Sequence, residues 1–146
     1  MDDAKQQGQQ WLTRLLHLVG AESTVQVQCG EAELGDSLWL VIDASPFSPD
    51  RIQALIGVDG DVLDAIQYLA NTILNLGIEE GDRAAYTVEL NGYRQQRQEE
   101  LKGMARQAAE RVRETGQEVE MTHLSAAERR QVHNFFETNT PDRGNL

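Results

Sequence analysis

A tight Gly-x-x-Gly turn between two apolar helical patterns constrains this chain more than any other feature. Leu55 and Ile56 close a short helical pattern, Gly57–Gly60 forms the turn, and Asp61–Asn71 has the apolar spacing of a longer helix. Glycine tolerates positive φ and has no side chain, so two glycines let a ligand approach the backbone closely. The N–H groups that open the second helix can meet an anion such as phosphate. The segment therefore predicts a nucleic-acid clamp.

The patterns on either side of this turn predict a small α+β domain. An opening helix has Trp11, Leu12, Leu15, Leu16 and Val19 on one face and ends at Gly20. Two antiparallel strands are predicted at 24–29 and 38–42, joined by turn residues 30–36, and a third strand at 86–90. A short helix at 51–56 follows Ser48 or Asp50, and Asp61 is predicted to cap the next helix, which ends near 75–77. The predicted order is α-β-β-α-α-β.

The C-terminal part predicts two further helices with a short strand between them. The first runs over 93–115 to a cap at Gly116, with an apolar stripe of Leu101, Met104, Ala105, Ala108, Ala109 and Val112. A strand is predicted at 118–121. Ser125-Ala126-Ala127-Glu128 has the spacing of a capping box, so the second helix begins at Ala126, with Val132, Phe135 and Phe136 on its core face.

Two motifs in sequence order resemble a known family. The Gly-x-x-Gly turn with its flanking residues resembles a KH domain of the second type, and Arg129-x-x-x-His133 resembles the R-three-H signature of single-stranded nucleic-acid-binding modules. That pairing and order are similar to the bacterial Jag family, also called SpoIIIJ-associated or KhpB proteins. The resemblance implies a KH type II domain at 1–92, with helices on one face of a three-stranded sheet, and a small α+β R-three-H module at 93–146.

In the KH part, the resemblance implies that Gly57, Val58, Asp59 and Gly60 clamp RNA by its backbone, beside an apolar groove at Leu55 and Ile56. Family loops commonly carry basic residues at the two variable positions, where this chain has Val58 and Asp59, followed by Asp61. A carboxylate beside phosphate costs about 1 kcal/mol at an effective dielectric near 20. The alternative is that the loop persists as an element of the fold and does not grip RNA.

In the second module, cationic residues fall on two helices. Lys102, Arg106 and Arg113 lie within about 40° of one another at 100° per residue, so they can follow a phosphate backbone or form a solvated flank with Arg106 paired to Glu110. Arg129, Arg130 and His133 lie on one side of the last helix, where they can contact phosphate and a base. Alternatively, Arg129 pairs with a nearby Glu and His133 stabilises the fold. Family modules continue with a further strand, so either this module is incomplete or the natural chain continues past Leu146.

Charge is distributed unevenly over the 146 residues, whose formal net charge is −11. Residues 1–80 hold thirteen Asp or Glu against three Lys or Arg, and residues 81–146 hold eleven against ten. Because affinity for a polyanion depends on cations that neutralise phosphates, RNA contact is expected mainly in the second module.

Composition and motifs exclude several classes. The longest apolar run, 38–42, is far shorter than the roughly 20 residues that span a membrane, and the acidic start is unlike a signal peptide, which predicts a cytoplasmic location. The single Cys29 is expected to be a small buried hydrophobe. No metal-ligand spacing, nucleophile elbow or Walker loop is present, so we expect no enzyme activity, metal or cofactor.

Together these patterns predict a non-catalytic bacterial protein that binds single-stranded RNA, with single-stranded DNA as a further ligand, and regulates gene expression after transcription. The resemblance also implies a small KH-domain protein or a second copy as partner. The alternative is a KH-fold protein-interaction adaptor that has lost strong RNA binding, which the acidic first half favours.

Overall fold

The computed structural model describes residues 2–30 and 36–139, with side chains described for 3–30 and 36–138. The predicted turn at 30–36 and the tail after Asn139 lie largely outside these residues. The described chain divides into two compact units, with the division between Arg94 and Gln95. Each unit is described by itself.

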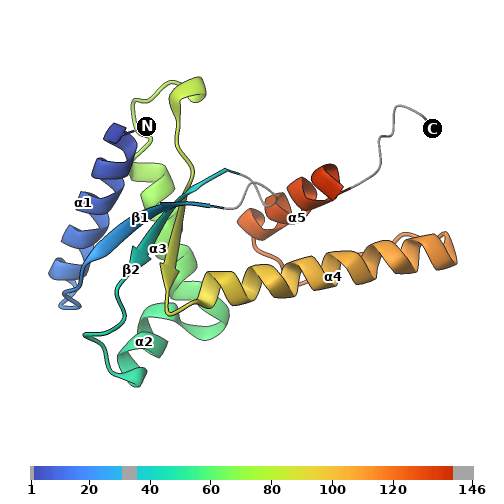
Figure 1. Ribbon diagram of the computed structural model, residues 1–146, viewed down its shortest axis with the longest axis horizontal. Helices are drawn as coiled ribbons and strands as arrows, with labels where there is room; N and C mark the ends of the chain where they lie inside the picture. Colours follow the sequence, from blue (N-terminus) through green and yellow to red (C-terminus); the bar gives the residue numbers. More distant parts are fainter. Residues whose placement is uncertain (1, 31–35, 140–146) are drawn as a thin grey trace. The chain divides into compact units, whose positions relative to one another are not determined.

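The first unit is an α+β fold built on a three-stranded sheet (Figure 1). Its elements follow the predicted order α-β-β-α-α-β, with a 3-10 turn on either side of α3. Their bounds are α1 (Asp2–Leu18), β1 (Val25–Cys29), β2 (Leu38–Ile42), α2 (Pro49–Ile56), η2 (Val58–Gly60), α3 (Asp61–Ile73), η3 (Glu80–Asp82) and β3 (Tyr86–Leu90). Strand β2 lies in the centre, antiparallel to β1 and parallel to β3, with Leu40 opposite both Val27 and Val88.

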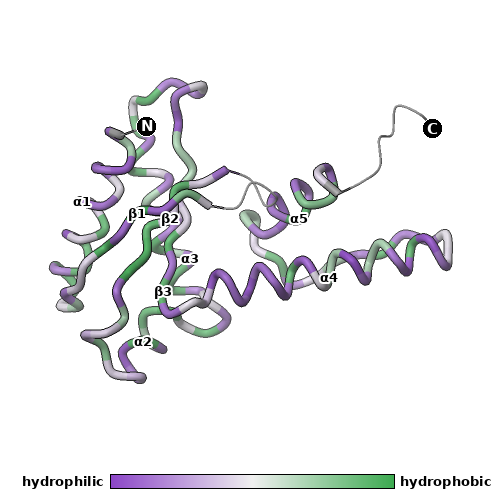
Figure 2. Tube along the Cα trace, in the orientation of Figure 1, coloured by the Kyte–Doolittle hydropathy of each residue, from purple (hydrophilic) through white to green (hydrophobic). Residues whose placement is uncertain are grey.

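The core of this unit forms where α1 and α3 cover the sheet. Alternate residues of β2 and β3 are buried there, and Figure 2 shows the apolar character of β2. From the helices, Leu12, Leu16, Leu63 and Ala70 fill the same cluster and are fully buried. Gly8 lets α1 approach the sheet, because a Cβ at this position would lie 2.8 Å from the Tyr86 ring. The predicted period-two strands and amphipathic helices are therefore found, although Val19 is 56% exposed.

Side-chain amides on α3 and in the turn that follows it bind the outer edge of β3 and Ala84, which precedes the strand. Asn71 accepts from the Tyr86 N–H at 2.8 Å and donates to the Tyr86 carbonyl at 2.9 Å. Asn75 makes the same pair of bonds with Ala84, at 3.0 and 2.8 Å, and Gln67 accepts from the Val88 N–H at 2.9 Å. These three amides stand one helical turn apart, so they follow the strand edge as a neighbouring strand would. We call Gln67, Asn71 and Asn75 the amide ladder.

Two expectations for the first unit were wrong. Cys29 is exposed, because it ends the edge strand β1, which pairs with β2 alone among the described residues. Asp61 does not cap α3. Gly60 is the N-cap, in the left-handed conformation, and no side chain caps it.

The polar residues of β3 are buried with hydrogen-bond partners. Thr87 donates to Ser37, and Glu89 accepts from the N–H groups of Leu90 and Arg94.

The second unit contains α4, whose residues Tyr93 and Arg94 belong to the first unit, and α5. Helix α4 spans Tyr93–Thr115, as predicted, and α5 spans Ala126–Asn139, beginning at the predicted residue. Leu101, Ala105, Leu124, Val132 and Phe135 are buried in its core. Figure 2 shows that the first turns of α4 are hydrophilic. Val112, placed on the apolar stripe from sequence, is 43% exposed.

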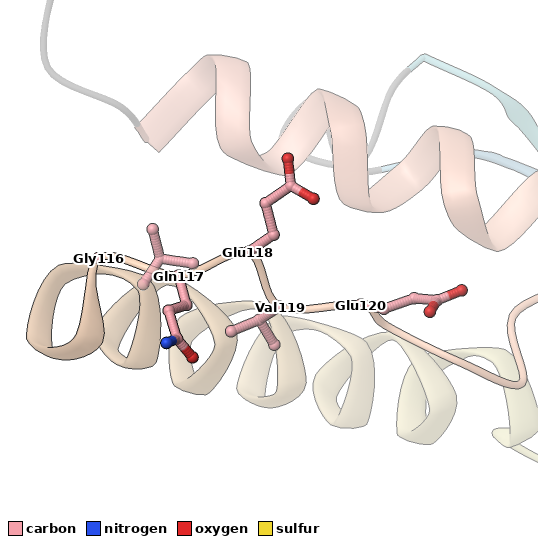
Figure 3. A pocket seen from close by; sticks show the side chains of 6 residues that line it. Gly116, Gln117, Glu118, Val119 and Glu120 are labelled. Carbon is pink, nitrogen blue, oxygen red and sulfur yellow. The ribbon is translucent and has the colours of Figure 1, made fainter.

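The strand predicted at 118–121 is wrong. These residues form no strand, and the described residues offer them no ladder partner. Figure 3 shows Glu118 and Val119 pointing to opposite sides of the backbone, as in an extended segment. With Val112, Gly116, Gln117 and Glu120 they line a shallow hollow of about 590 Å³. Local alternation therefore gives an extended shape here but no hydrogen-bonded ladder.

The amide ladder leads to a stability prediction. Replacing Asn71 with the similarly sized Leu should lower the free energy of unfolding by about 1–3 kcal/mol, since the N–H and C=O of Tyr86 lose their partners. Urea denaturation followed by circular dichroism measures this loss. Thr72→Leu, at the exposed next position, is the control and should change stability by less than about 0.5 kcal/mol. Equal effects of the two substitutions would show that the ladder contributes nothing.

Candidate nucleic-acid interface

The Gly-x-x-Gly turn connects α2 to α3 through two glycines with positive φ. Ser48 caps α2 by accepting from the Arg51 N–H at 3.2 Å, and the helix ends at Gly57, where φ is 81°. A Cβ on Gly57 would lie 2.6 Å from the Val62 side chain and 2.8 Å from its backbone nitrogen. The first glycine is therefore required because the start of α3 lies directly against it.

The second glycine is enclosed by the protein itself. Gly60 is buried, has φ 79°, and a Cβ on it would lie 2.7 Å from the ring of Tyr93, the first residue of α4. The tip between the glycines is open instead: Val58 is 74% exposed, and the exposed Asp59 also has positive φ, at 53°. A ligand can thus reach Val58 and Asp59, whereas the Cβ side of Gly60 is filled by an aromatic ring.

The other predicted residues of the loop region are mostly packed inside. Ile56 is buried in the core and Leu55 is half-buried against it. Of the nearby carboxylates, Asp64 binds Arg94 at 2.7 Å, while Asp59 and Asp61 form no ion pair with any described residue. The surface at the loop therefore carries negative charge and exposed apolar atoms.

A partly buried ion pair holds the start of α5. Glu128 accepts from the Ser125 N–H, and Ser125 Oγ accepts from the Glu128 N–H, both at 3.1 Å, as the predicted capping box requires. The same Glu128 carboxylate receives two bonds from Arg97, at 2.6 and 3.3 Å. The hydrogen bond with Glu128 raises the pKa of Arg97 above its usual range, although partial burial lowers it. Arg97 thus stays charged and ties α4 to α5.

The residues of the Arg-x-x-x-His motif follow this anchor on the open side of α5. Arg129 and Arg130 are exposed, and neither guanidinium meets a carboxylate within ion-pair distance in the described chain. His133 is exposed, with Nε2 3.0 Å from Glu137 one turn later. The three side chains therefore share the solvent-facing side of one helix, with the two arginines available to an anion.

Of the three cationic residues predicted to follow a phosphate backbone along α4, one is buried and two are exposed. Lys102 is buried, with Nζ 3.6 Å from Glu99, and so does not share the exposed side with the other two residues. The exposed Arg106 stacks over the Phe135 ring, 5.4 Å from its centre, and no pairing with Glu110 is found among the described side chains. Arg113 is exposed near the end of the helix. Arg106 and Arg113 remain candidates for phosphate contact.

Arg97, which positions the motif helix α5, was not predicted from the sequence. Its partner Glu128 lies 31 residues further along, so local spacing gives no sign of the pair. The i,i+3 neighbour Glu100, 3.2 Å from Arg97, was the only local signal, and it points to a surface pair.

Two kinds of feature are absent from the part of the chain that the structure describes. None of the helices within 2–30 and 36–139 has the length and apolar character needed to cross a membrane. In the same residues, no group of three or more His, Cys, Asp or Glu side chains is placed to hold a metal ion. The hollow at 112–120 contains Glu118 and Glu120 and no cation, so it does not suit a phosphate.

Comparison with known proteins finds similarity to a domain family within the second unit. The R-three-H domain family matches residues 99–139, which include most of α4 and all of α5. Over 84 residues the chain is 31% identical to a protein of Clostridium symbiosum named RNA-binding protein KhpB. That alignment covers 58% of this chain and 37% of the relative, so the chain spans little more than a third of the relative's length. These matches support a KhpB-like protein with an R-three-H domain.

The enclosure of Gly60 gives a prediction for the loop. Gly60→Ala should lower the free energy of unfolding by about 2–4 kcal/mol, since it adds a left-handed strain of about 1–2 kcal/mol to overpacking against Tyr93. Gly77→Ala is a matched control, because φ there is 74° but a Cβ would meet nothing within 4 Å. Gly77→Ala should therefore lower the free energy of unfolding only by the cost of the left-handed strain, about 1–2 kcal/mol. Thermal and urea denaturation of both variants would test this, and equal losses would contradict the role of Tyr93.

Proposed function

We propose that this protein binds single-stranded RNA and so regulates gene expression after transcription, without catalysing a reaction. The observation that carries the proposal is the pair Arg129 and Arg130, exposed and without ion-pair partners among the described residues, beside His133 on a helix anchored by Arg97–Glu128. Guanidinium groups bind phosphate with directed hydrogen bonds, and an imidazole can stack on a base. The match of these residues to the R-three-H domain and the name of the KhpB relative support it.

The proposed domain division is a KH type II domain at 1–92 and an R-three-H domain at 93–146. The α-β-β-α-α-β order, the mixed sheet and the open tip of the Gly57–Gly60 turn support a KH fold for the first part. In this proposal Val58 and Asp59 lie beside the RNA backbone, while Leu55, Ile56 and Gly60 maintain the shape of the loop. Because of Asp59 and Asp61, the loop adds little affinity and most of it comes from α5, Arg106 and Arg113.

The proposal also covers the cellular location of the protein, a second nucleic-acid ligand and a protein partner. We infer a cytoplasmic bacterial protein that can also bind single-stranded DNA, since phosphate contacts and base stacking do not require a 2′-hydroxyl. A small KH-domain protein or a second copy is the proposed protein partner. If RNA binding fails in the tests below, the KH-fold adaptor becomes the better description.

Removing the two arginines should weaken RNA binding. We expect Arg129→Ala combined with Arg130→Ala to lower affinity for a fluorescent oligouridine at least about tenfold, since two charged hydrogen bonds are lost. The slope of log K against log salt should also become shallower by about 1.4, or about 0.7 for each phosphate contact on a single strand. Fluorescence anisotropy over a series of salt concentrations measures both quantities.

Arg14→Ala combined with Arg51→Ala is the control, because it removes the same charge from the first unit. It should leave the salt slope unchanged, whereas a general electrostatic effect would change the slope equally in both variants. If neither pair affects binding, the proposed site on α5 is wrong.

A second test addresses the loop. Asp59→Asn keeps a residue that tolerates positive φ and removes the carboxylate, so affinity for RNA should rise about threefold to tenfold if phosphate lies beside the loop. Glu79→Gln removes one negative charge at another exposed position of the first unit and should have a smaller effect. Equal effects would mean that the Gly57–Gly60 turn is not at the RNA.

A further inference from the structure

Exposed apolar side chains are concentrated along one segment of the first unit. Of the ten large hydrophobic residues exposed among the described residues, seven lie between Val58 and Ile78. Single exposed hydrophobic residues are common on protein surfaces, but a contiguous group marks an interaction site. The segment includes α3, of which a neighbouring side fills the core through Leu63 and Ala70.

On α3 these side chains form a stripe. At about 100° per residue, Val62, Leu69 and Ile73 lie within about 40° of one another, and Leu76 follows in the turn after the helix. Their exposed fractions are 38%, 42%, 43% and 71%. We call these four residues the α3 stripe. The helix cannot rotate to bury it, because Leu63 and Ala70 are held in the core and the amides of Gln67 and Asn71 are bound to β3.

The length of the stripe fits a helical partner. From Val62 to Leu76 it extends about 20 Å, since a helix rises 1.5 Å per residue. A helix that presents apolar residues at every third or fourth position can pack along this row. One helix face is small beside the roughly 800 Å² per partner of a standard stable interface, so a reversible complex is expected.

The charges at both ends of the stripe select the kind of partner. Helix α3 contains no Lys or Arg, and Asp59 and Asp61 stand at its N-terminal end. Beyond its C-terminal end lie Glu79, Glu80 and Asp82 against one cation, Arg83, which donates to the Ile78 carbonyl. A second copy would place carboxylates against carboxylates, whether the two helices ran parallel or antiparallel. Lys or Arg at both ends of a partner helix would instead be attracted.

We propose that the α3 stripe binds an amphipathic helix of another protein, with an apolar face flanked at both ends by Lys or Arg. This surface lies in the first unit and uses none of the arginines of α5. It therefore adds a protein-binding function that does not depend on whether the chain binds RNA.

The test uses the full chain and two designed helical peptides of about 20 residues. Both carry Leu along one stripe; one has Lys at both ends and the other has Glu. In ¹⁵N-labelled protein, the Lys peptide should shift the amide resonances of the α3 stripe and bind at least tenfold more tightly than the Glu peptide. Raising the salt concentration should reduce this difference.

Variants identify the surface. Leu69→Gln combined with Ile73→Gln changes two exposed positions and should weaken binding of the Lys peptide at least tenfold. Leu18→Gln combined with Val19→Gln removes exposed apolar surface at the end of α1 and should leave binding unchanged. Unchanged oligouridine binding by the first pair would show that the two surfaces are separate.

Several results would overturn the proposal. They are equal affinity for the two peptides, binding that persists in the Leu69/Ile73 variant, or no shift with either peptide. Concentration-dependent dimerisation that the same pair abolishes, seen by sedimentation equilibrium, would assign the stripe to a second copy instead. Shifts of the stripe on adding oligouridine, with loss of RNA binding in the pair variant, would assign it to RNA bases.

Discussion

The first unit depends on hydrogen bonds between side-chain amides of α3 and the backbone groups at one edge of strand β3. Among the described residues, strand β3 has a neighbouring strand, β2, on one side only. The amide ladder binds the other side at Tyr86 and Val88, and also binds Ala84, which precedes the strand. Buried backbone groups without partners are costly, so these bonds fix both the rotation and the height of α3 against the sheet. The Gly57–Gly60 turn and the α3 stripe are carried by this helix, and their positions follow from the ladder.

The two units carry different kinds of recognition. The first presents carboxylates and exposed apolar side chains, and its loop glycines are enclosed by Val62 and Tyr93. The second presents Arg129 and Arg130 on a helix that Arg97 and Glu128 fix in place. In the proposed function, an acidic chain binds a polyanion because the exposed cations proposed to contact it lie on α4 and α5, while most of the excess negative charge lies in the first 80 residues.

Local pattern predicted the elements well and the long-range contacts poorly. The strand at 86–90, the helix at 93–115 and the capping box at Ser125 depend on period and spacing within a few residues, which the sequence displays directly. The strand at 118–121 failed because a strand needs a partner, which local alternation does not supply. Lys102 was placed on the surface by helical projection, but projection gives only a direction and not what covers it. The Arg97–Glu128 pair and the Gly60–Tyr93 packing join residues more than 30 positions apart.

Glu128 has a consequence for how mutational screens of this protein would be interpreted. Its carboxylate serves the Ser125 N–H and the Arg97 guanidinium together, one residue before the proposed contact Arg129. A library scored for ligand capture would therefore rank acidic position 128 among the most sensitive sites, although a carboxylate there repels phosphate. Such a result would reflect the loss of the ion pair that joins the two helices. Only a parallel score for folded protein would distinguish position 128 from the arginines that are proposed to contact the ligand.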